Sequence, residues 1–396
     1  MKVRETWSFL QPDLDNIQAV RGRLYPPILE EAQGPEPVID GRRVINLASN
    51  NYLGLSFHPE LIAAAVRATE EFGVGAGAVR ILTGTMTLHR EMERRLAAFK
   101  RSEAAVVYQS GFTANAGTVA ALLGPEDLIV SDQLNHASII DGARLSKAQI
   151  KVYPHANADA AEEVLRSSEH RRRLLVTDGV FSMDGDIAPL PELVEVAERY
   201  DAILMVDDAH SSGVLGNHGR GTVDHYGLHG RVPIQIGTLS KALGLMGGYA
   251  TGDQPLADYL LNRARPFVFS TGHPPAVAAA CIAAVDILER DTSLVDRLWD
   301  NTRYFQGELR AMGYDLGATK TPITPVILGE EERAVAFSHG LSQRGVYAPS
   351  IAYPIVPRGT ARLRVMISAM HERDHLDRAL EAFRHIGIEY GVIGSS

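Results

Sequence analysis

The sequence contains one cysteine, Cys281, among its 396 residues. A single cysteine excludes an internal disulfide bond and every metal site that is built from several cysteines. Cys281 lies within the apolar run AVAAACIAAV, so we interpret it as a small buried hydrophobic residue. The near absence of cysteine is typical of a reducing compartment, and we predict a cytoplasmic protein.

The sequence also lacks an excess of positive charge. It has 48 aspartate and glutamate residues against 39 lysine and arginine residues, and its formal net charge is −9. Proteins that bind nucleic acids need a basic surface, so we expect no nucleic-acid partner. The longest apolar runs are too short to cross a membrane, and residues 1–15 contain no apolar stretch of the signal-peptide kind, so we expect no membrane partner.

What the sequence does contain is a regular alternation of strand-like and helix-like segments. Short apolar runs predict strands at residues 103–108, 127–132, 150–155, 173–179, 202–210 and 233–239. These runs are continuously apolar rather than alternating, as expected for a sheet that is buried on both faces. The pattern predicts an α/β fold in which a mostly parallel sheet lies between layers of helices.

The pattern changes near residue 291, where a long helix-like segment leads into two strand candidates and a final helix. A chain of this length is expected to contain more than one structural unit. We predict an N-terminal arm with a helix at residues 1–50, a large α/β domain at residues 51–290 and a smaller α+β domain at residues 291–396.

Polar residues gather where the predicted strands end, which is where ligands bind in open α/β sheets. Asp207 and Asp208 lie together at the end of one strand, and because neighbouring strand residues point to opposite faces, only one of them is expected to face a site. His136 follows another strand, where it could cap a helix or face a ligand. Ser110 and Gly111 follow a strand and open a helix, whose N–H groups suit an anion such as phosphate.

Lys241 is the one charged residue of the segment IGTLSKALGLMGGYATG, residues 236–252. Because its neighbours are apolar, loss of water is expected to lower the pKa of its amine and to favour the neutral, nucleophilic form. A neutral lysine amine suits a Schiff base with an aldehyde. We interpret the glycines that follow, Gly244, Gly247 and Gly248, as a tight turn beside a bulky ligand.

Together these residues match what pyridoxal 5'-phosphate (PLP) requires. Its aldehyde needs a lysine, its ring nitrogen an acid, its ring face a flat side chain and its phosphate a cradle of N–H groups. The sequence HERDH at residues 371–375 matches a zinc-protease pattern, but it lies at a predicted junction between a strand and a helix, so we expect no metal site.

Longer motifs strengthen this interpretation. The α-oxoamine synthase family of fold-type I PLP enzymes resembles this sequence almost from end to end, through the segments INLASNNYLGLSFHPEL, GAVRILTGTMTLHREME, SDQLNHASIIDGARL, TDGVFSMDGDIAPL, VDDAHSSGVLGNHGRG and ARLRVMISAMHERD. The resemblance implies a fold-type I PLP transferase with a large domain and a smaller C-terminal domain. It also implies a homodimer whose subunits share their active sites.

The resemblance implies a role for individual residues. Lys241 is expected to bind PLP covalently and then to act as a base, while Asp207 pairs with the ring nitrogen. His136 is expected to stack on the ring, and His210 to face the ring hydroxyl. The other positions implied as cofactor contacts are Ser110, Gly111, Phe112, Ser182 and Thr238, together with Ser270 and Thr271 from the second subunit.

The carboxylate of the amino-acid substrate is assigned to Asn50 and Arg364 in the same way. Arg362 lies two residues from Arg364, on the same face if the segment is a strand, so only the resemblance selects Arg364.

The implied reaction is a Claisen-type condensation of an amino acid with an acyl-CoA. Val79 and the segment YPIVPRG at residues 353–359 favour the glycine C-acetyltransferases, so we expect glycine and acetyl-CoA to give 2-amino-3-oxobutyrate and CoA. The 8-amino-7-oxononanoate synthases, which condense L-alanine with pimeloyl-CoA and release carbon dioxide, are nearly as similar. The sequence also leaves open a broad-specificity synthase, and a PLP lyase or aminotransferase on the same fold.

Overall fold

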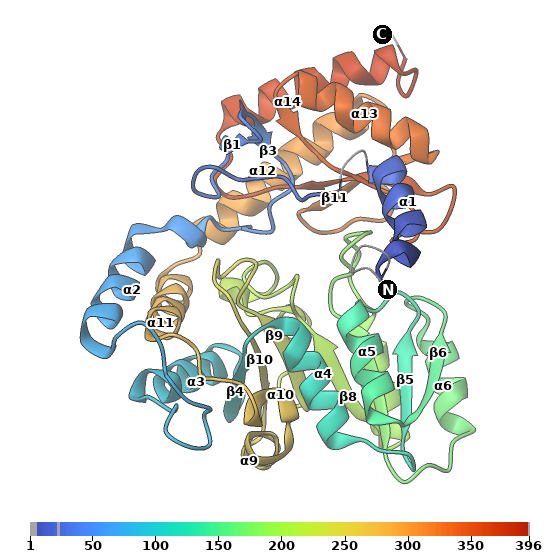
Figure 1. The fold of residues 1–396 in the computed structure, drawn as a ribbon. Coiled ribbons are helices and arrows are strands. Elements are labelled where there is room, and N and C mark those ends of the chain that lie inside the picture. The colour runs from blue at the N-terminus through green and yellow to red at the C-terminus, as the bar shows by residue number, and fades with distance from the viewer. Residues whose placement is uncertain (1–5, 22–23, 395–396) are drawn as a thin grey trace.

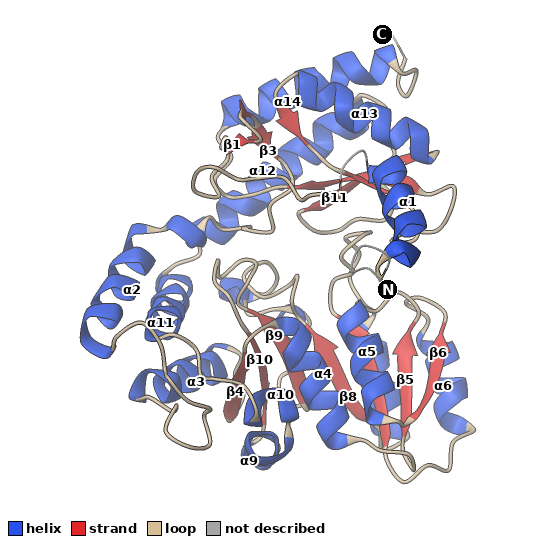
Figure 2. Cartoon of the chain, viewed as in Figure 1, coloured by secondary structure: helices blue, strands red, loops and turns tan. Residues whose placement is uncertain are grey.

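A computed structural model describes residues 6–21 and 24–394 of the chain (Figure 1). The start of the predicted N-terminal arm, residues 1–5, lies outside the described part. Figure 2 shows a larger region built around a long row of strands and a smaller region that holds the C-terminal helices. The domain boundaries that we placed at residues 50 and 290 stay predictions.

The larger region is built on a seven-stranded sheet with the strand order β4-β10-β9-β8-β7-β5-β6. The neighbouring pairs from β9 to β6 are all parallel. The mostly parallel sheet and its six predicted strands are therefore confirmed. The strands are β4 (Ala104–Tyr108), β5 (Leu128–Asp132), β6 (Gln149–Tyr153), β7 (Arg173–Asp178), β8 (Ile203–Asp207), β9 (Ile234–Thr238) and β10 (Gly248–Gly252).

The strand β10 corrects one prediction. The sequence predicts a turn at Gly248, but this residue begins a strand that runs antiparallel to both β4 and β9. Close packing requires glycine here, since a Cβ atom on Gly248 would lie 2.4 Å from the carbonyl oxygen of Ser110. The turn itself ends at Gly247, whose φ angle of 142° suits glycine.

Helices cover both faces of this sheet (Figure 2). Because successive side chains of a strand point to opposite faces, Ile129 packs in one hydrophobic cluster and Val130 in another. The first cluster includes residues of α4 (Gly111–Leu122), α5 (Ala137–Ser146), α9 (Gln254–Arg263) and α10 (Arg265–Val268). The second includes residues of α6 (Ala158–Arg166), α7 (Leu190–Arg199) and α8 (Thr222–His225).

Further helices flank the sheet near β4 and β10. The helix α11 (Pro275–Arg290) packs against α2 (Pro59–Phe72) and α3 (Thr87–Phe99). The apolar run around Cys281 lies in α11, and Cys281 is completely buried, as predicted. Among the described residues, no helix is both long and apolar enough to cross a membrane.

The smaller region is an α+β unit, as predicted. Its antiparallel sheet has the order β11-β14-β13, formed by β11 (Ile323–Gly329), β14 (Ala361–Met366) and β13 (Ser350–Ile351). The helices α12 (Ser293–Ala311), α13 (Glu331–Gln343) and α14 (Arg373–Glu389) belong to it (Figure 1). The N-terminal part adds α1 (Gln11–Arg21), the β1 (Val38–Ile39) and β2 (Arg42–Arg43) hairpin, and β3 (Ile45–Asn46), which pairs with β12 (Val346–Tyr347).

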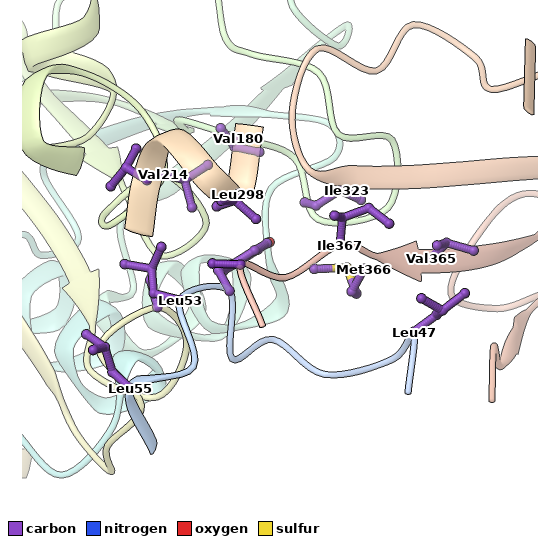
Figure 3. Packing of buried hydrophobic residues seen from close by; sticks show 14 of the residues in the cluster. Leu47, Leu53, Leu55, Val180, Val214, Leu298, Ile323, Val365, Met366 and Ile367 are labelled. Carbon is purple, nitrogen blue, oxygen red and sulfur yellow. The ribbon is translucent and has the colours of Figure 1, made fainter. Parts of the chain in front are cut away.

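One continuous hydrophobic core joins the two regions (Figure 3). Leu53 comes from the segment after β3, and Val180 and Val214 come from the loops after β7 and β8. They belong to the same cluster as Leu298 of α12 and Met366 of β14. This core holds the end of β14 close to the loops that follow the central strands, so residues from both regions meet there.

A buried ion pair supports the loop after β8. Asp208 and Lys100 are both completely buried, and Lys100 Nζ lies 2.7 Å from Asp208 Oδ2. The Lys100 amine also donates to the Arg220 carbonyl oxygen at 2.5 Å, and the Ser211 hydroxyl donates to Asp208 Oδ1 at 2.5 Å. The two adjacent acids therefore have different partners, since Asp207 contacts none of these groups. A buried pair of this kind depends on both members.

Replacing Lys100 with methionine should leave the Asp208 carboxylate buried without a cation. We expect the Lys100→Met variant to lose about 3–5 kcal/mol of unfolding free energy, measured by urea denaturation. The matched control is Arg231→Met, which breaks an exposed pair with Glu198 and should cost less than about 1 kcal/mol. Equal losses in the two variants would contradict the role assigned to the buried pair.

Candidate active site

Four parallel strands end in buried polar residues at one edge of the sheet. Asp132, Asp178, Asp207 and Thr238 are the last residues of β5, β7, β8 and β9, and each is at most 5% exposed. Because the strands are parallel, their C-terminal ends lie at the same edge. The polar groups are thereby brought together where open α/β sheets bind ligands.

Asp207 is held by neutral groups. Its Oδ2 accepts a hydrogen bond from the Asn115 amide at 2.6 Å, and its Oδ1 accepts one from the Ala209 N–H at 2.8 Å. Neither donor carries a positive charge, although the carboxylate is only 4% exposed. Among the described residues, no cation contacts this buried carboxylate directly, so a cationic ligand atom beside Asp207 would stabilise it.

Asp178 lies beside Asp207 on the neighbouring strand, where the two residues are paired in register. Burial and the charge of Asp207 raise the pKa of Asp178 well above its usual value. This favours the neutral form of Asp178. Asp178 Oδ2 also accepts a hydrogen bond from the backbone N–H of His136 at 2.9 Å.

Lys241 follows β9, three residues beyond Thr238. Burial lowers the pKa of its amine from 10.5 to about 8, with Asp207 opposing this shift and Arg364 adding to it. The Lys241 carbonyl accepts from the Gly244 N–H at 2.9 Å, which closes a tight turn. Gly244 has a φ angle of 72°, and a Cβ atom there would lie 2.3 Å from the Ser56 nitrogen.

His136 forms the N-cap of α5. Its Nδ1 accepts a hydrogen bond from the Ser138 N–H at 3.2 Å and lies 2.7 Å from the Ser138 hydroxyl. The Asn115 amide, which binds Asp207, also donates to that hydroxyl at 2.9 Å. His136 is thus a helix cap and a neighbour of the site at once, and the residue is exposed.

His210 is buried three residues after the end of β8. Burial first, and then the charges of Lys241 and Arg364, hold the pKa of His210 well below its usual value. The imidazole is therefore neutral. Its Nδ1 lies 2.8 Å from the hydroxyl of Tyr52, which is completely buried.

The predicted phosphate cradle lies at the start of α4. The Ser110 hydroxyl caps this helix by accepting from the Thr113 N–H at 3.1 Å. The first N–H groups of a helix have no acceptor inside it, so those of Gly111 and Phe112 are available to an anion. Thr238 packs against the turn, since a Cβ atom on Gly111 would lie 3.1 Å from the Thr238 side chain. The Thr238 hydroxyl donates to the Gly247 carbonyl at 2.9 Å.

The two arginines of β14 have different partners. Arg362 is buried and binds the Asp184 carboxylate at 2.5 Å, together with the Met183 carbonyl at 3.2 Å. Arg364 contacts only neutral oxygens: the Ser182 carbonyl at 2.5 Å and Asn50 Oδ1 at 3.3 Å. Within the described part of the chain, no carboxylate neutralises Arg364. The structure therefore separates two arginines that the strand pattern left equivalent.

The loop that carries Ser182 is anchored by His155. Its Nδ1 lies 3.0 Å from Asp132 Oδ1, and its Nε2 lies 2.9 Å from Asp186 Oδ2. Burial favours the neutral ring, but these two carboxylates raise the pKa of His155 to about 10. The protonated ring therefore links the end of β5 to the loop after β7 at neutral pH. That loop supplies the carbonyl that orients Arg364.

Ser270 and Thr271 follow α10; Ser270 is partly buried and Thr271 is exposed. The Thr271 carbonyl accepts from the Gln109 amide of the same chain at 2.8 Å, next to the predicted phosphate cradle. Their predicted contact with the phosphate of a second subunit stays a prediction.

Three residues of the site were missed in the sequence. Asp178 ends a predicted strand, so the rule that selected Asp207 could have found it. Asn115 lies one turn inside a helix, and Tyr52 lies in an irregular segment far from β8 in the sequence. Neither position carries a local pattern that indicates contact with Asp207 or His210.

These residues fit PLP. Asp207 is a buried anion held by neutral donors alone, as a protonated ring nitrogen requires. Lys241 has a depressed pKa, as an aldehyde-binding amine requires. The start of α4 supplies free N–H groups for a phosphate.

Comparisons with known proteins agree with this geometry. The family described as aminotransferase class I and II matches residues 42–383. The 8-amino-7-oxononanoate synthase of Symbiobacterium thermophilum is 54% identical over 389 residues, which cover 97% of this chain and 99% of that protein. The 8-amino-7-oxononanoate synthase 1 of Bacillus subtilis is 56% identical over 388 residues, covering 98% and 99%. The structure of serine palmitoyltransferase from S. paucimobilis with a bound PLP–myriocin aldimine has a TM-score of 0.93 and 33% identity, covering 99% and 100%.

These relatives correct the expected substrates. The prediction of a glycine C-acetyltransferase is wrong, because relatives that match at 54–56% identity over nearly the whole chain are 8-amino-7-oxononanoate synthases. The structure shows where the two features that favoured the acetyltransferase lie. Val79 forms a backbone bridge with Thr271, and Tyr353 and Ile355 of the 353–359 segment are about half exposed.

The depressed pKa of Lys241 predicts how the cofactor-free protein captures PLP. Only the neutral amine attacks an aldehyde, so the rate of capture should rise with pH through a midpoint near 8 rather than 10.5. The visible absorbance of the bound cofactor measures this rate in a stopped-flow spectrometer. The Lys241→Ala variant should show no such band, and a midpoint near 10.5 in the unmodified protein would contradict the effect of burial.

Proposed function

We propose that this chain, a member of the class I and II aminotransferase family and a PLP enzyme of the α-oxoamine synthase type, uses L-alanine and pimeloyl-CoA as its substrates. The products would be 8-amino-7-oxononanoate, CoA and carbon dioxide. The observation that carries this proposal is the 54–56% identity over nearly full length to relatives named for that product. The geometry of the site supports it, since Arg364 offers an uncompensated cation to a substrate carboxylate.

When bound, PLP supplies a conjugated ring that accepts the electron pair released at the Cα atom of the amino acid. Asp207 holds the proton on the ring nitrogen, which strengthens that acceptor. His136 would cover one face of the ring, and His210 would face the ring hydroxyl. The N–H groups of Gly111 and Phe112 hold the phosphate at the start of α4.

Lys241 has two roles in the proposed reaction. It would hold the cofactor covalently in the absence of substrate, and its free amine would remove the Cα proton of alanine. Its pKa of about 8 suits this role, because the amine can take and release a proton near neutral pH. Arg364 and Asn50 bind the alanine carboxylate and so orient the Cα–H bond toward Lys241.

The proposed bond changes balance with two protons, one that Lys241 removes from alanine Cα and one taken from solvent. A carbon–carbon bond forms between alanine Cα and the thioester carbonyl carbon, and the carbon–sulfur bond of pimeloyl-CoA breaks. CoA leaves with a proton at sulfur, the alanine carboxylate leaves as carbon dioxide, and Cα receives a proton in its place. The proposed assembly is a homodimer in which Ser270 and Thr271 approach the phosphate bound by the other subunit.

A CoA-release assay tests the substrates directly. L-alanine and glycine are each combined with pimeloyl-CoA and acetyl-CoA, and release of carbon dioxide from carboxyl-labelled amino acid is followed in parallel. We expect the highest kcat/KM with L-alanine and pimeloyl-CoA, with glycine lower by about tenfold, because one methyl group gives modest discrimination. Turnover that is fastest with glycine and acetyl-CoA, without carbon dioxide release, would contradict the proposal.

The role of Arg364 predicts a defect confined to one substrate. The Arg364→Met variant removes the cation that meets the alanine carboxylate, so the KM for L-alanine should rise by about 100-fold, while the KM for pimeloyl-CoA changes little. Arg303→Met is the control, because Arg303 lies on the surface in an exposed pair with Asp300. An unchanged KM for L-alanine would show that another group binds the carboxylate.

A further inference from the structure

The neutral imidazole of His210 can take either of two tautomeric forms. The imidazole is neutral and buried, so one ring nitrogen carries a proton and the other carries a lone pair. If Nε2 carries the proton, His210 is a hydrogen-bond donor toward a ligand. If Nδ1 carries the proton, Nε2 presents a lone pair, which repels an oxygen atom that is itself a hydrogen-bond acceptor. The partner of Nδ1 decides between these forms.

That partner is Tyr52. The Tyr52 hydroxyl lies 2.8 Å from His210 Nδ1, and the two rings meet edge to face at a centroid distance of 6.2 Å. Within the described residues, this hydroxyl has no other hydrogen-bond partner, and neither has His210 Nε2. Burial raises the pKa of Tyr52, so the phenol keeps its proton. A phenol is a good donor and a weak acceptor, whereas the unprotonated imidazole nitrogen is a good acceptor.

The backbone of Tyr52 is fixed from the smaller region. Its carbonyl accepts from the Ala369 N–H at 2.7 Å and from the Ser368 hydroxyl at 3.1 Å. Both donors follow β14, the strand that carries Arg364. The hydroxyl end of Tyr52 contacts His210 near the central sheet. The side chain therefore spans the two regions and has little freedom to turn away from His210.

We propose that Tyr52 is a positioning residue whose phenolic O–H donates a hydrogen bond to His210 Nδ1. This hydrogen bond places the imidazole proton on Nε2, where it can be donated to the ring hydroxyl oxygen of PLP. This inference rests on the cofactor site within the proposed function and is independent of the substrates. The ring oxygen of bound PLP carries negative charge and accepts hydrogen bonds, so a lone pair on Nε2 would repel it. Tyr52 selects the useful tautomer before the cofactor binds.

The tautomer can be observed directly. Long-range ¹H–¹⁵N correlation spectra of the full chain, labelled with ¹⁵N-histidine, distinguish a protonated from an unprotonated ring nitrogen; the His210→Gln variant assigns the signal. We expect His210 to carry its proton on Nε2 both in the cofactor-free protein and in the PLP-loaded protein. A proton on Nδ1 in the cofactor-free protein overturns the proposal, without need of any variant of Tyr52.

The Tyr52→Phe variant tests the cause. We expect a measurable fraction of the Nδ1–H tautomer in its cofactor-free form and a five- to tenfold weaker affinity for PLP, about the value of one hydrogen bond. Tyr314→Phe is the matched control, since Tyr314 is buried and its hydroxyl donates to the Phe383 carbonyl at 2.6 Å in the smaller region. This control should leave both readouts unchanged.

The outcomes separate this proposal from the proposed function. A Tyr52→Phe variant that keeps the original tautomer and the original PLP affinity would overturn the role of Tyr52. Neither readout involves an amino acid or an acyl-CoA. Failure of the alanine and pimeloyl-CoA assay would therefore leave the assignment of Tyr52 intact, and failure of the assignment would leave the substrate proposal intact.

Discussion

The buried carboxylate of Asp207 accepts its hydrogen bonds from neutral groups, and within the described residues no cation contacts it directly. It sits at the end of the central strand β8, where its hydrogen bonds come from an amide side chain and a backbone N–H. Asp208, the next residue, shows the contrasting arrangement, because it is neutralised by Lys100 in a fully buried pair. The two adjacent acids thus have different partners: Asp208 is paired with a buried cation, and Asp207 is the acid that we propose pairs with the ring nitrogen of PLP.

The neighbours of Asp207 follow from this constraint. Asp178 lies beside it with a raised pKa, so a second anion is avoided. Asn115 donates both of its amide protons, one to Asp207 and one to the Ser138 hydroxyl that contacts His136. The side chain that holds the anion therefore also orients the residue expected to cover the ring. The acid and the stacking residue are parts of one hydrogen-bonded network.

The positions of the positively charged groups of the site, Arg364 and Lys241, depend on the contact between the two regions. Arg364 reaches the site from β14 and lacks a carboxylate partner among the described residues, while Arg362 is neutralised by Asp184. The charge of Arg364 adds to burial in lowering the pKa of Lys241. The hydrophobic core in Figure 3 joins β14 to the loops after β7 and β8. It therefore has a chemical consequence, because it holds the strand that carries Arg364 close to the site of Lys241.

The sequence by itself determined the α/β fold, six strands of its mostly parallel sheet and the polar residues at their ends. Strands buried on both faces leave continuous apolar runs in the sequence, and the polar residues that can bind a ligand follow those runs. It also indicated the lowered pKa of Lys241 from its apolar neighbours. It did not reveal β10, because GYATG lacks the apolar run of a buried strand and owes its pairing to close backbone packing. Only the tertiary structure decided which of Arg362 and Arg364 is free, and which partners hold Asp207 and His210. Those contacts join residues far apart in the chain, and their energies depend on distance and burial, which no local pattern records.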